Sequence, residues 1–278
     1  MPCSVYFANL LTLCKDWTIE NKAKIFPSDR PENLKASFTA FVQYNGSHPV
    51  TFQYLRDEYK NAVEGITPPV KEQKAMLDHL GQHLFALYLW DEFPLHGPEG
   101  LLDLFYEKTK PEETDFDQGI WASLFEHIGY SLRNTKVLND SMKQQLLAFV
   151  AWRLKARVAD ELYHFVSWLD ADCLDAGWRL ETYCKILDLD MPKNARRGLA
   201  LRRLNHLLPM HADKVLECFL KITQRVDSSN PFYIPEKEIR PILEAGFKSG
   251  NGGLKTMANE ARENLLRLGQ FEFMDMEE

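Results

Sequence analysis

His79 and His83, in the segment HLGQH, are the residues whose type and spacing come closest to metal chemistry. Two histidines four residues apart share one face of a helix, which suits a pair of zinc ligands. A zinc-dependent protease, however, needs Glu at the position that Leu80 holds, and no third ligand is indicated nearby. The surrounding helix is also strongly apolar. We therefore favour a structural role for both histidines and predict no metal site.

The sequence contains none of the common nucleophile or phosphate-binding motifs. GxSxG, GxxxxGK[ST] and GxGxxG are all absent. Gly250-Asn251-Gly252-Gly253 lies between two expected helices and lacks the lysine and hydroxyl of a P-loop, which favours a turn. Cys173 and Cys184 have no activating histidine at a fixed spacing, so we interpret them as core thiols. We predict no catalytic residue and no cofactor, and expect a protein that is not an enzyme.

Acidic residues are concentrated in the segment 160–190. Paired carboxylates can perform acid–base catalysis, but these lie mainly at helix ends, where they usually cap the helix or balance its dipole. We therefore predict a solvated acidic edge formed by Asp160, Glu161, Asp170, Asp172, Asp175, Asp188 and Asp190.

One basic cluster follows this acidic edge. At 100° per residue, four of its side chains fall within about a third of the helix circumference, while Arg202 is turned away. We call these four the basic ridge: Lys193, Arg196, Arg197 and Arg203. Such a ridge can bind phosphate or an acidic partner, and we take it as the candidate partner-binding site. The alternative, which we favour, is a ladder of ion pairs with the acidic edge.

Composition narrows the class of protein. Of 278 residues, 45% are hydrophobic and 12% aromatic, enough for a sizeable core. The net charge of −7 and a pI near 5.7 disfavour non-specific binding to nucleic acid. The five cysteines are scattered without a CxxC pair, as in reduced cytosolic proteins. The N-terminus lacks the basic region of a signal peptide, and no apolar run is long enough to span a membrane. We expect a soluble, cytoplasmic protein without membrane contact.

These residues are carried by amphipathic helices that arrive in pairs, roughly every 35–45 residues from Val70 onward. No segment alternates with the period of a strand. The predicted fold class is all-α, a HEAT-like α-solenoid of antiparallel helical hairpins. The expected helices are Lys71–Trp90, Leu101–Tyr106, Gln118–Leu132, one capped by Asn139-Asp140-Ser141, Asp160–Leu169, Leu174–Leu187, Ala195–Leu208, His211–Val226, Ile239–Phe247 and Leu254–Leu268. The glycine-rich link 248–253 favours a left-handed helix C-cap and a tight reversal.

The first residues follow no clear repeat. We expect helices at Val5–Trp17, Leu34–Tyr44 and Val50–Val63, closed by the breaker Thr67-Pro68-Pro69. This predicts an irregular N-terminal helical cap over 1–66 and a helical-repeat array over 67–278.

Three segments carry a resemblance to known proteins: Gly81–Lys108 (GQHLFALYLWDEFPLHGPEGLLDLFYEK), Phe125–Leu138 (FEHIGYSLRNTKVL) and Ile242–Phe273. They resemble the C-terminal HEAT-like helical-repeat region of large bacterial defence-type NTPase or SIR2-like proteins, over about 200 residues from Gly81 onward. The resemblance implies an array for target sensing or assembly, and a protein partner such as an NTPase or effector subunit, or a phage protein. It implies no catalytic residues, and the chain carries neither a Walker motif nor a SIR2-like core.

The leading functional hypothesis is therefore a non-enzymatic interaction module for protein recognition or assembly, as the sensor or scaffold part of a bacterial anti-phage defence system. Stacked repeats provide the extended surface that such a role needs. The alternative is a nucleic-acid or nucleotide-sensing helical domain that uses the basic ridge within 193–203. Neither the identity of the partner nor the oligomeric state is predicted by the sequence.

Overall fold

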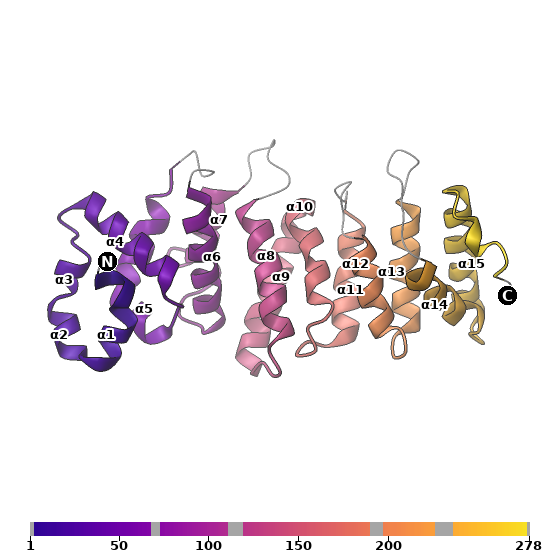
Figure 1. Cartoon of the computed structure of the whole chain (residues 1–278), viewed down its shortest axis with the longest axis horizontal. Helices are drawn as coiled ribbons and strands as arrows, with labels where there is room; N and C mark the ends of the chain where they lie inside the picture. The colour runs from indigo at the N-terminus through magenta and orange to yellow at the C-terminus, as the bar shows by residue number, and fades with distance from the viewer. Residues whose placement is uncertain (1–2, 68–72, 111–118, 190–196, 226–235, 277–278) are drawn as a thin grey trace. The chain divides into compact units, whose positions relative to one another are not determined.

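The structure is a computed structural model, and it describes residues 3–67, 73–110, 119–189, 197–225 and 236–276. Every regular element in these ranges is a helix, which confirms the all-α class for the part described (Figure 1). The chain forms two compact units. Unit 1 comprises Met1–Leu124 and Asn139–Trp152, and unit 2 comprises Phe125–Leu138 and Arg153–Glu278. No helix in the described ranges is both long enough and apolar enough to cross a bilayer.

Unit 1 is built from short helices followed by longer ones. Its elements are η1 (Cys3–Tyr6), α1 (Phe7–Leu13), α2 (Lys15–Glu20), α3 (Lys22–Ile25), α4 (Pro31–Tyr44), α5 (Pro49–Glu64), α6 (Lys74–Leu89) and α7 (Leu101–Thr109), with the first part of α8 (Ile120–Arg133) and most of α9 (Asp140–Ala156). The predicted helices at Leu34–Tyr44 and Val50–Val63 are confirmed as α4 and α5.

The segment Val5–Trp17 is not the single helix that its apolar character predicts. It divides into η1, α1 and α2, and the break falls at Cys14, whose backbone leaves the helical region (φ −145°, ψ 62°). In α1 the buried residues are Phe7 and Leu11, whereas in α2 the buried residue is Thr18. The chain changes direction between them, and this brings Phe26, after α3, against the Phe7 ring.

The expected boundary after residue 66 falls inside unit 1. Helix α4 packs against α6 and α5 packs against α7, so helices from both sides of residue 66 share one core. Aromatic rings fill this core at edge-to-face angles, which suit the ring quadrupoles. Phe41 contacts Phe7, Phe26 and Tyr59 in this way, at centroid distances of 6.1, 6.1 and 6.3 Å.

Unit 2 contains the rest of α8 and α9, and then α10 (Ala159–Leu162), η3 (Tyr163–Trp168), α11 (Ala176–Leu187), α12 (Arg197–Leu207), α13 (Ala212–Gln224), α14 (Glu236–Phe247), α15 (Gly252–Arg267) and η4 (Phe271–Phe273). The predicted N-cap before α9 is confirmed, because Asn139 Oδ1 accepts the Met142 N–H at 2.8 Å. The helix expected at Asp160–Leu169 is instead one α-turn followed by 3-10 geometry.

Helices of unit 2 pack at alternate positions along the chain. Helix α13 lies between α11 and α15, and α12 packs against α14. Sequential pairs also pack, most extensively α14 with α15. Helix α13 therefore contacts its chain neighbours α12 and α14 as well as α11 and α15, which are two places away (Figure 1).

The link between α14 and α15 makes the expected reversal by a different backbone geometry. The left-handed C-cap predicted within 248–253 is wrong: among the described glycines, Gly97 and Gly269 have φ in the left-handed region, and Gly250 does not. Asn251 instead caps α15 by accepting the Gly253 N–H at 2.9 Å. Gly246 permits the close approach of the two helices, because a Cβ there would lie 2.5 Å from Ala258 Cβ.

Candidate functional site

Arg203 of the basic ridge lies in the interior of unit 2. The residue is 5% exposed, its Nε is 2.9 Å from Asp170 Oδ2, and its Nη1 donates to the Val166 carbonyl oxygen. Asp170 belongs to the acidic edge, so this contact is the ion pair that the alternative interpretation of the ridge predicts. A guanidinium held in this way is not available to an external phosphate.

Of the other three ridge residues, the structure describes Arg197. Arg197 is half-buried at the first residue of α12, and both it and Arg203 lie close enough to Tyr183 to act on its pKa. Burial raises the pKa of Tyr183, and the two arginines partly offset that effect. Lys193 and Arg196 lie outside the described residues. The structure thus brings Arg197 and Arg203 together around a buried phenol.

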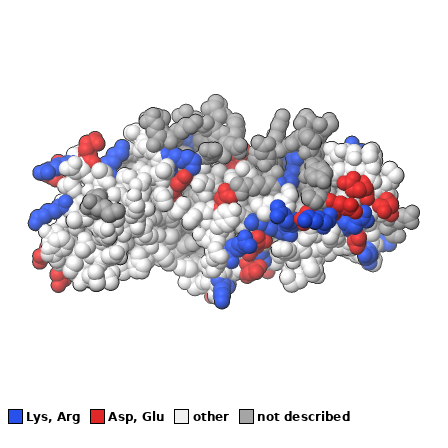
Figure 2. Space-filling model, in the orientation of Figure 1, with Lys and Arg blue, Asp and Glu red and all other residues white. Residues whose placement is uncertain are grey.

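Basic side chains on the face of unit 2 in Figure 2 form a band with acidic side chains beside it. Several basic residues of this unit form ion pairs with acidic neighbours. Lys221 Nζ lies 2.8 Å from Asp188 Oδ1, Lys214 pairs with Glu181, and Lys248 Nζ lies 2.7 Å from Glu244 Oε2. Neutralised pairs attract phosphate less than isolated cations do, since the local fields cancel.

His83 has a structural role, as predicted. Its Nε2 is 2.7 Å from the Asn45 carbonyl oxygen, which can only accept, so Nε2 carries the proton. Its Nδ1 then accepts from the Tyr59 hydroxyl at 2.7 Å. Burial lowers the pKa of His83 to about 4, so the ring is neutral near pH 7. Both ring nitrogens are occupied and His79 is exposed. The described residues contain no cluster of three or more ligand-type side chains.

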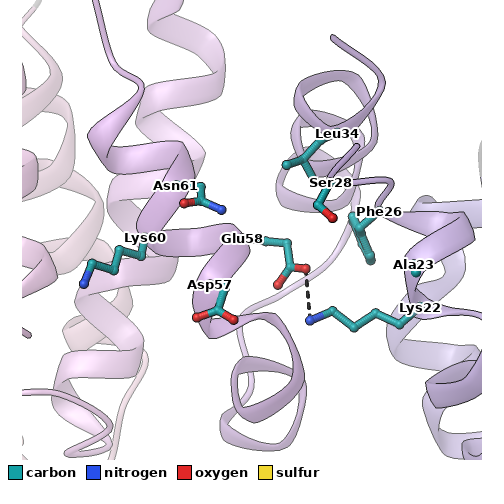
Figure 3. Close-up of a pocket in the computed structure, with 9 residues that line it drawn as sticks. All are labelled: Lys22, Ala23, Phe26, Ser28, Leu34, Asp57, Glu58, Lys60 and Asn61. Atoms are coloured by element: carbon teal, nitrogen blue, oxygen red, sulfur yellow. Dashed lines mark ion pairs between the residues drawn. The ribbon is translucent and has the colours of Figure 1, made fainter. Parts of the chain in front are cut away.

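A pocket of about 450 Å³ opens in unit 1 between α3, α4 and α5 (Figure 3). The Phe26 ring and the Glu58 carboxylate form its buried part, and Lys22 Nζ lies 3.0 Å from Glu58 Oε1. The other lining residues are Ala23, Ser28, Leu34, Asp57, Lys60 and Asn61.

The pocket combines one partly buried ion pair with polar side chains nearer its mouth. Asp57 and Asn61 lie one turn apart on α5 at the mouth, whereas Lys60 points away from the Lys22–Glu58 pair (Figure 3). Ser28 is the one hydroxyl in the described lining, and no imidazole stands beside it as a general base. The second oxygen, Glu58 Oε2, is buried without a hydrogen-bond partner among the described residues. The pocket therefore offers a polar recess with one fixed ion pair.

The helical pattern of the sequence does not predict this pocket. Glu58 follows Leu55 by three residues and precedes Tyr59, so it lies beside the apolar stripe of α5 that we used to predict the helix. A carboxylate at such a position could have indicated a buried ion pair, because a buried charge needs a partner. Its partner, Lys22, comes from a short helix that the pattern did not predict.

Large apolar side chains are exposed at the N-terminal end of unit 1. Leu13 is 83% exposed and Trp17 is 49% exposed, and Tyr6 and Ile19 belong to the same three short elements. All four lie within residues 6–19, and contiguous exposed apolar surface is typical of interaction sites. Comparison of the chain with protein-family models, with curated proteins and with solved structures gives no match in any of the three.

Proposed function

We propose that this chain is a non-enzymatic helical-repeat module that binds a protein partner. The observation that carries the proposal is a set of hydrogen bonds in unit 2 between residues one repeat apart. Trp168 Nε1 donates to the Phe125 carbonyl oxygen at 2.9 Å, across 43 residues. Asn205 Nδ2 donates to the Glu238 carbonyl oxygen at 2.7 Å, across 33 residues. Arg203 and Arg225 donate to carbonyls 37 and 36 residues earlier.

This spacing supports a stacked array of the HEAT-like kind. In such an array each helical pair contacts its neighbours, so contacts recur at the length of one repeat. The packing of α11, α13 and α15 against one another, with α12 against α14, follows the same rule. In unit 1, α4 with α6 and α5 with α7 repeat it. An array of this kind provides surface rather than a deep polar site.

The proposed partner is a protein: an NTPase or effector subunit, or a phage protein, in a bacterial defence setting in the cytoplasm. The exposed apolar residues of η1, α1 and α2 support a protein partner over nucleic acid. The internal position of Arg203 and the net charge of −7 support the same choice.

The test is affinity purification of the chain from its host, with and without phage infection, followed by mass spectrometry. We expect a protein that co-purifies in constant ratio and survives nuclease treatment. Recovery of no stable partner under either condition, from a chain shown to be folded by circular dichroism, would overturn the proposal.

A charge-reversal pair separates the protein partner from the nucleic-acid alternative. Arg196→Glu with Arg197→Glu alters the ridge while leaving the buried Arg203 intact. Lys35→Glu with Lys248→Glu makes the same charge change at exposed positions elsewhere. We expect both double variants to retain the partner. The nucleic-acid alternative makes a different prediction. Nucleic acid would then co-purify with the wild type and with the Lys35 and Lys248 control, but not with the Arg196 and Arg197 variant.

A further inference from the structure

Two buried cysteines of unit 2 lie unusually close together. Cys184 of α11 and Cys218 of α13 are 34 residues apart in sequence, and their Sγ atoms are separated by 2.6 Å. Non-bonded carbon atoms already settle at about 3.5–4.0 Å, and sulfur is larger. A disulfide bond is about 2.05 Å long. The two sulfur atoms are therefore much closer than ordinary core neighbours.

We propose that Cys184 and Cys218 form a reversible disulfide that links α11 to α13. The two helices pack directly against each other, so the fold holds the two thiols side by side. The described residues supply no third ligand that would make this pair a metal site. The other cysteines are less suited: Cys173 Sγ donates to the Leu132 carbonyl oxygen, and Cys3 and Cys14 are in unit 1.

The oxidant is a peroxide, and Cys184 is the first thiol to react. Cys184 is 6% exposed and Cys218 is fully buried, so a small molecule reaches Cys184 first. Burial raises the pKa of the Cys218 thiol, which keeps that residue protonated. The Cys184 thiolate attacks one peroxide oxygen, and the O–O bond breaks. Hydroxide is the leaving group, and Cys184 becomes a sulfenic acid.

The second step closes the link. The Cys218 sulfur attacks the sulfenic sulfur of Cys184, the S–S bond forms, and the sulfenic oxygen leaves as water with the Cys218 proton. Each sulfur loses one electron overall, and the peroxide gains both. A dithiol reverses the reaction by exchange. Disulfides of this kind in reducing compartments are usually transient and redox-sensing.

The physical effect of the link is to restrain α11 and α13 to one relative position. It closes a loop of the length of one repeat, which lowers the entropy of the unfolded chain. Unit 2 then gains stability under oxidation and loses it on reduction. The link changes the stiffness of the array without adding any group to its surface.

The test treats the folded full chain with hydrogen peroxide and maps its peptides without reduction. We expect one cross-linked pair, containing Cys184 and Cys218, and an intact mass lower by two hydrogen atoms. The midpoint of thermal unfolding should rise by roughly 5 °C and return with dithiothreitol. The wild-type map does not depend on any variant folding.

Alanine variants give the matched comparison. Cys184→Ala and Cys218→Ala should each abolish the shift, while Cys173→Ala, at another buried thiol, should retain it. The proposal fails if the folded wild type yields sulfinic acid at Cys184, or pairs other than Cys184–Cys218. It also fails if the cross-linked pair is no more abundant than in the urea-unfolded chain.

Discussion

Units 1 and 2 hold their helices together by different chemistry. In unit 1 the buried contacts are mainly between rings, and the Tyr59–His83 pair joins them as a neutral hydrogen bond. In unit 2 three arginines are buried: Arg153 is 0% exposed, Arg179 is 3% exposed and Arg203 is 5% exposed.

The three arginines all serve the irregular segment around η3. Arg153 Nε lies 2.7 Å from Glu161 Oε1, Arg179 donates to the Leu169 carbonyl oxygen, and Arg203 donates to that of Val166. A 3-10 segment has poorer backbone hydrogen-bond geometry than an α-helix, and the Leu169 N–H reaches the Val166 carbonyl oxygen only at 3.4 Å. Guanidinium groups supply several donors in a fixed plane, and those of Arg179 and Arg203 add donors to the Leu169 and Val166 carbonyl oxygens. The difference teaches that aromatic packing is the main contact between the regular helices of unit 1, whereas the irregular segment of unit 2 is held by buried donors.

The largest effect should come from removing one of these arginines. Arg203→Met removes the guanidinium that pairs with the buried side of the Asp170 carboxylate and that donates to the Val166 carbonyl oxygen, at a cost of about 3–5 kcal/mol. Urea unfolding, with hydrogen exchange read on peptides of unit 2, measures the loss. Arg202→Met, at the exposed neighbouring position, should change stability by about 0.5 kcal/mol or less. Equal effects of the two substitutions would remove the distinction between the units.

Acid should destabilise unit 1 through His83. Its folded pKa of about 4 lies below the unfolded value of about 6.5, so between these limits the unfolded state binds the proton. Stability is therefore lost as pH falls from about 6.5 to 4, by roughly 3 kcal/mol, and the loss stops below the folded pKa. Urea unfolding at several pH values, with exchange read on peptides of α4 to α6, measures it.

The control for the acid effect is His83→Gln, which does not titrate. It should flatten this part of the pH profile of unit 1, although it lowers stability at neutral pH. An unchanged profile in this variant would assign the acid sensitivity to other groups.

The contact of α14 and α15 depends on a glycine that allows the two helices to pack closely, and a substitution there tests that packing. Gly246→Ala places a methyl group 2.5 Å from Ala258 Cβ, and the helices must separate. Overpacking of this kind costs about 2 kcal/mol. Gly198→Ala, where no atom lies within 4 Å, should be neutral or stabilising. Thermal unfolding of both variants measures the difference, and a stabilised Gly246→Ala variant would show that the helices adjust freely.

The smallest effect concerns the hydrogen bond within the ring cluster of unit 1. Tyr59→Phe keeps the ring contacts but removes the donor to His83 Nδ1, which costs about 1–2 kcal/mol. It should also change the pKa of His83, which NMR titration of the ring follows. No change in either quantity would mean that the rings alone hold this core.

The helices were largely predictable because each buries an apolar stripe with a period near 3.6 residues. Phe52, Leu55, Tyr59 and Val63 predict α5, and the structure buries all four. The prediction that polar residues cap helix starts is confirmed at Asn139 and Asp175, whose side chains accept backbone N–H groups. The breaks at Cys14 and in η3 were not predictable, since both segments are apolar enough to continue as helices and only packing interrupts them.

The candidate site was less predictable than the fold. The spacing of the basic ridge placed Arg203 on an exposed face, but Asp170 and the Val166 carbonyl draw it inside. The pocket at Lys22 and Glu58 brings α3 and α5 together although helix α4 separates them in the sequence, and the helical pattern does not encode that contact. The close approach of Cys184 and Cys218 has the same origin, since it depends on the packing of α11 against α13.

By itself, the sequence determined that this protein is helical, where most helices lie, and that His83 is a structural residue. Period and capping are local properties, so a single chain records them. Tertiary structure alone decided which charges are buried, which thiols meet and where a recess opens. These depend on distances between residues far apart in sequence, which packing sets and local patterns do not contain.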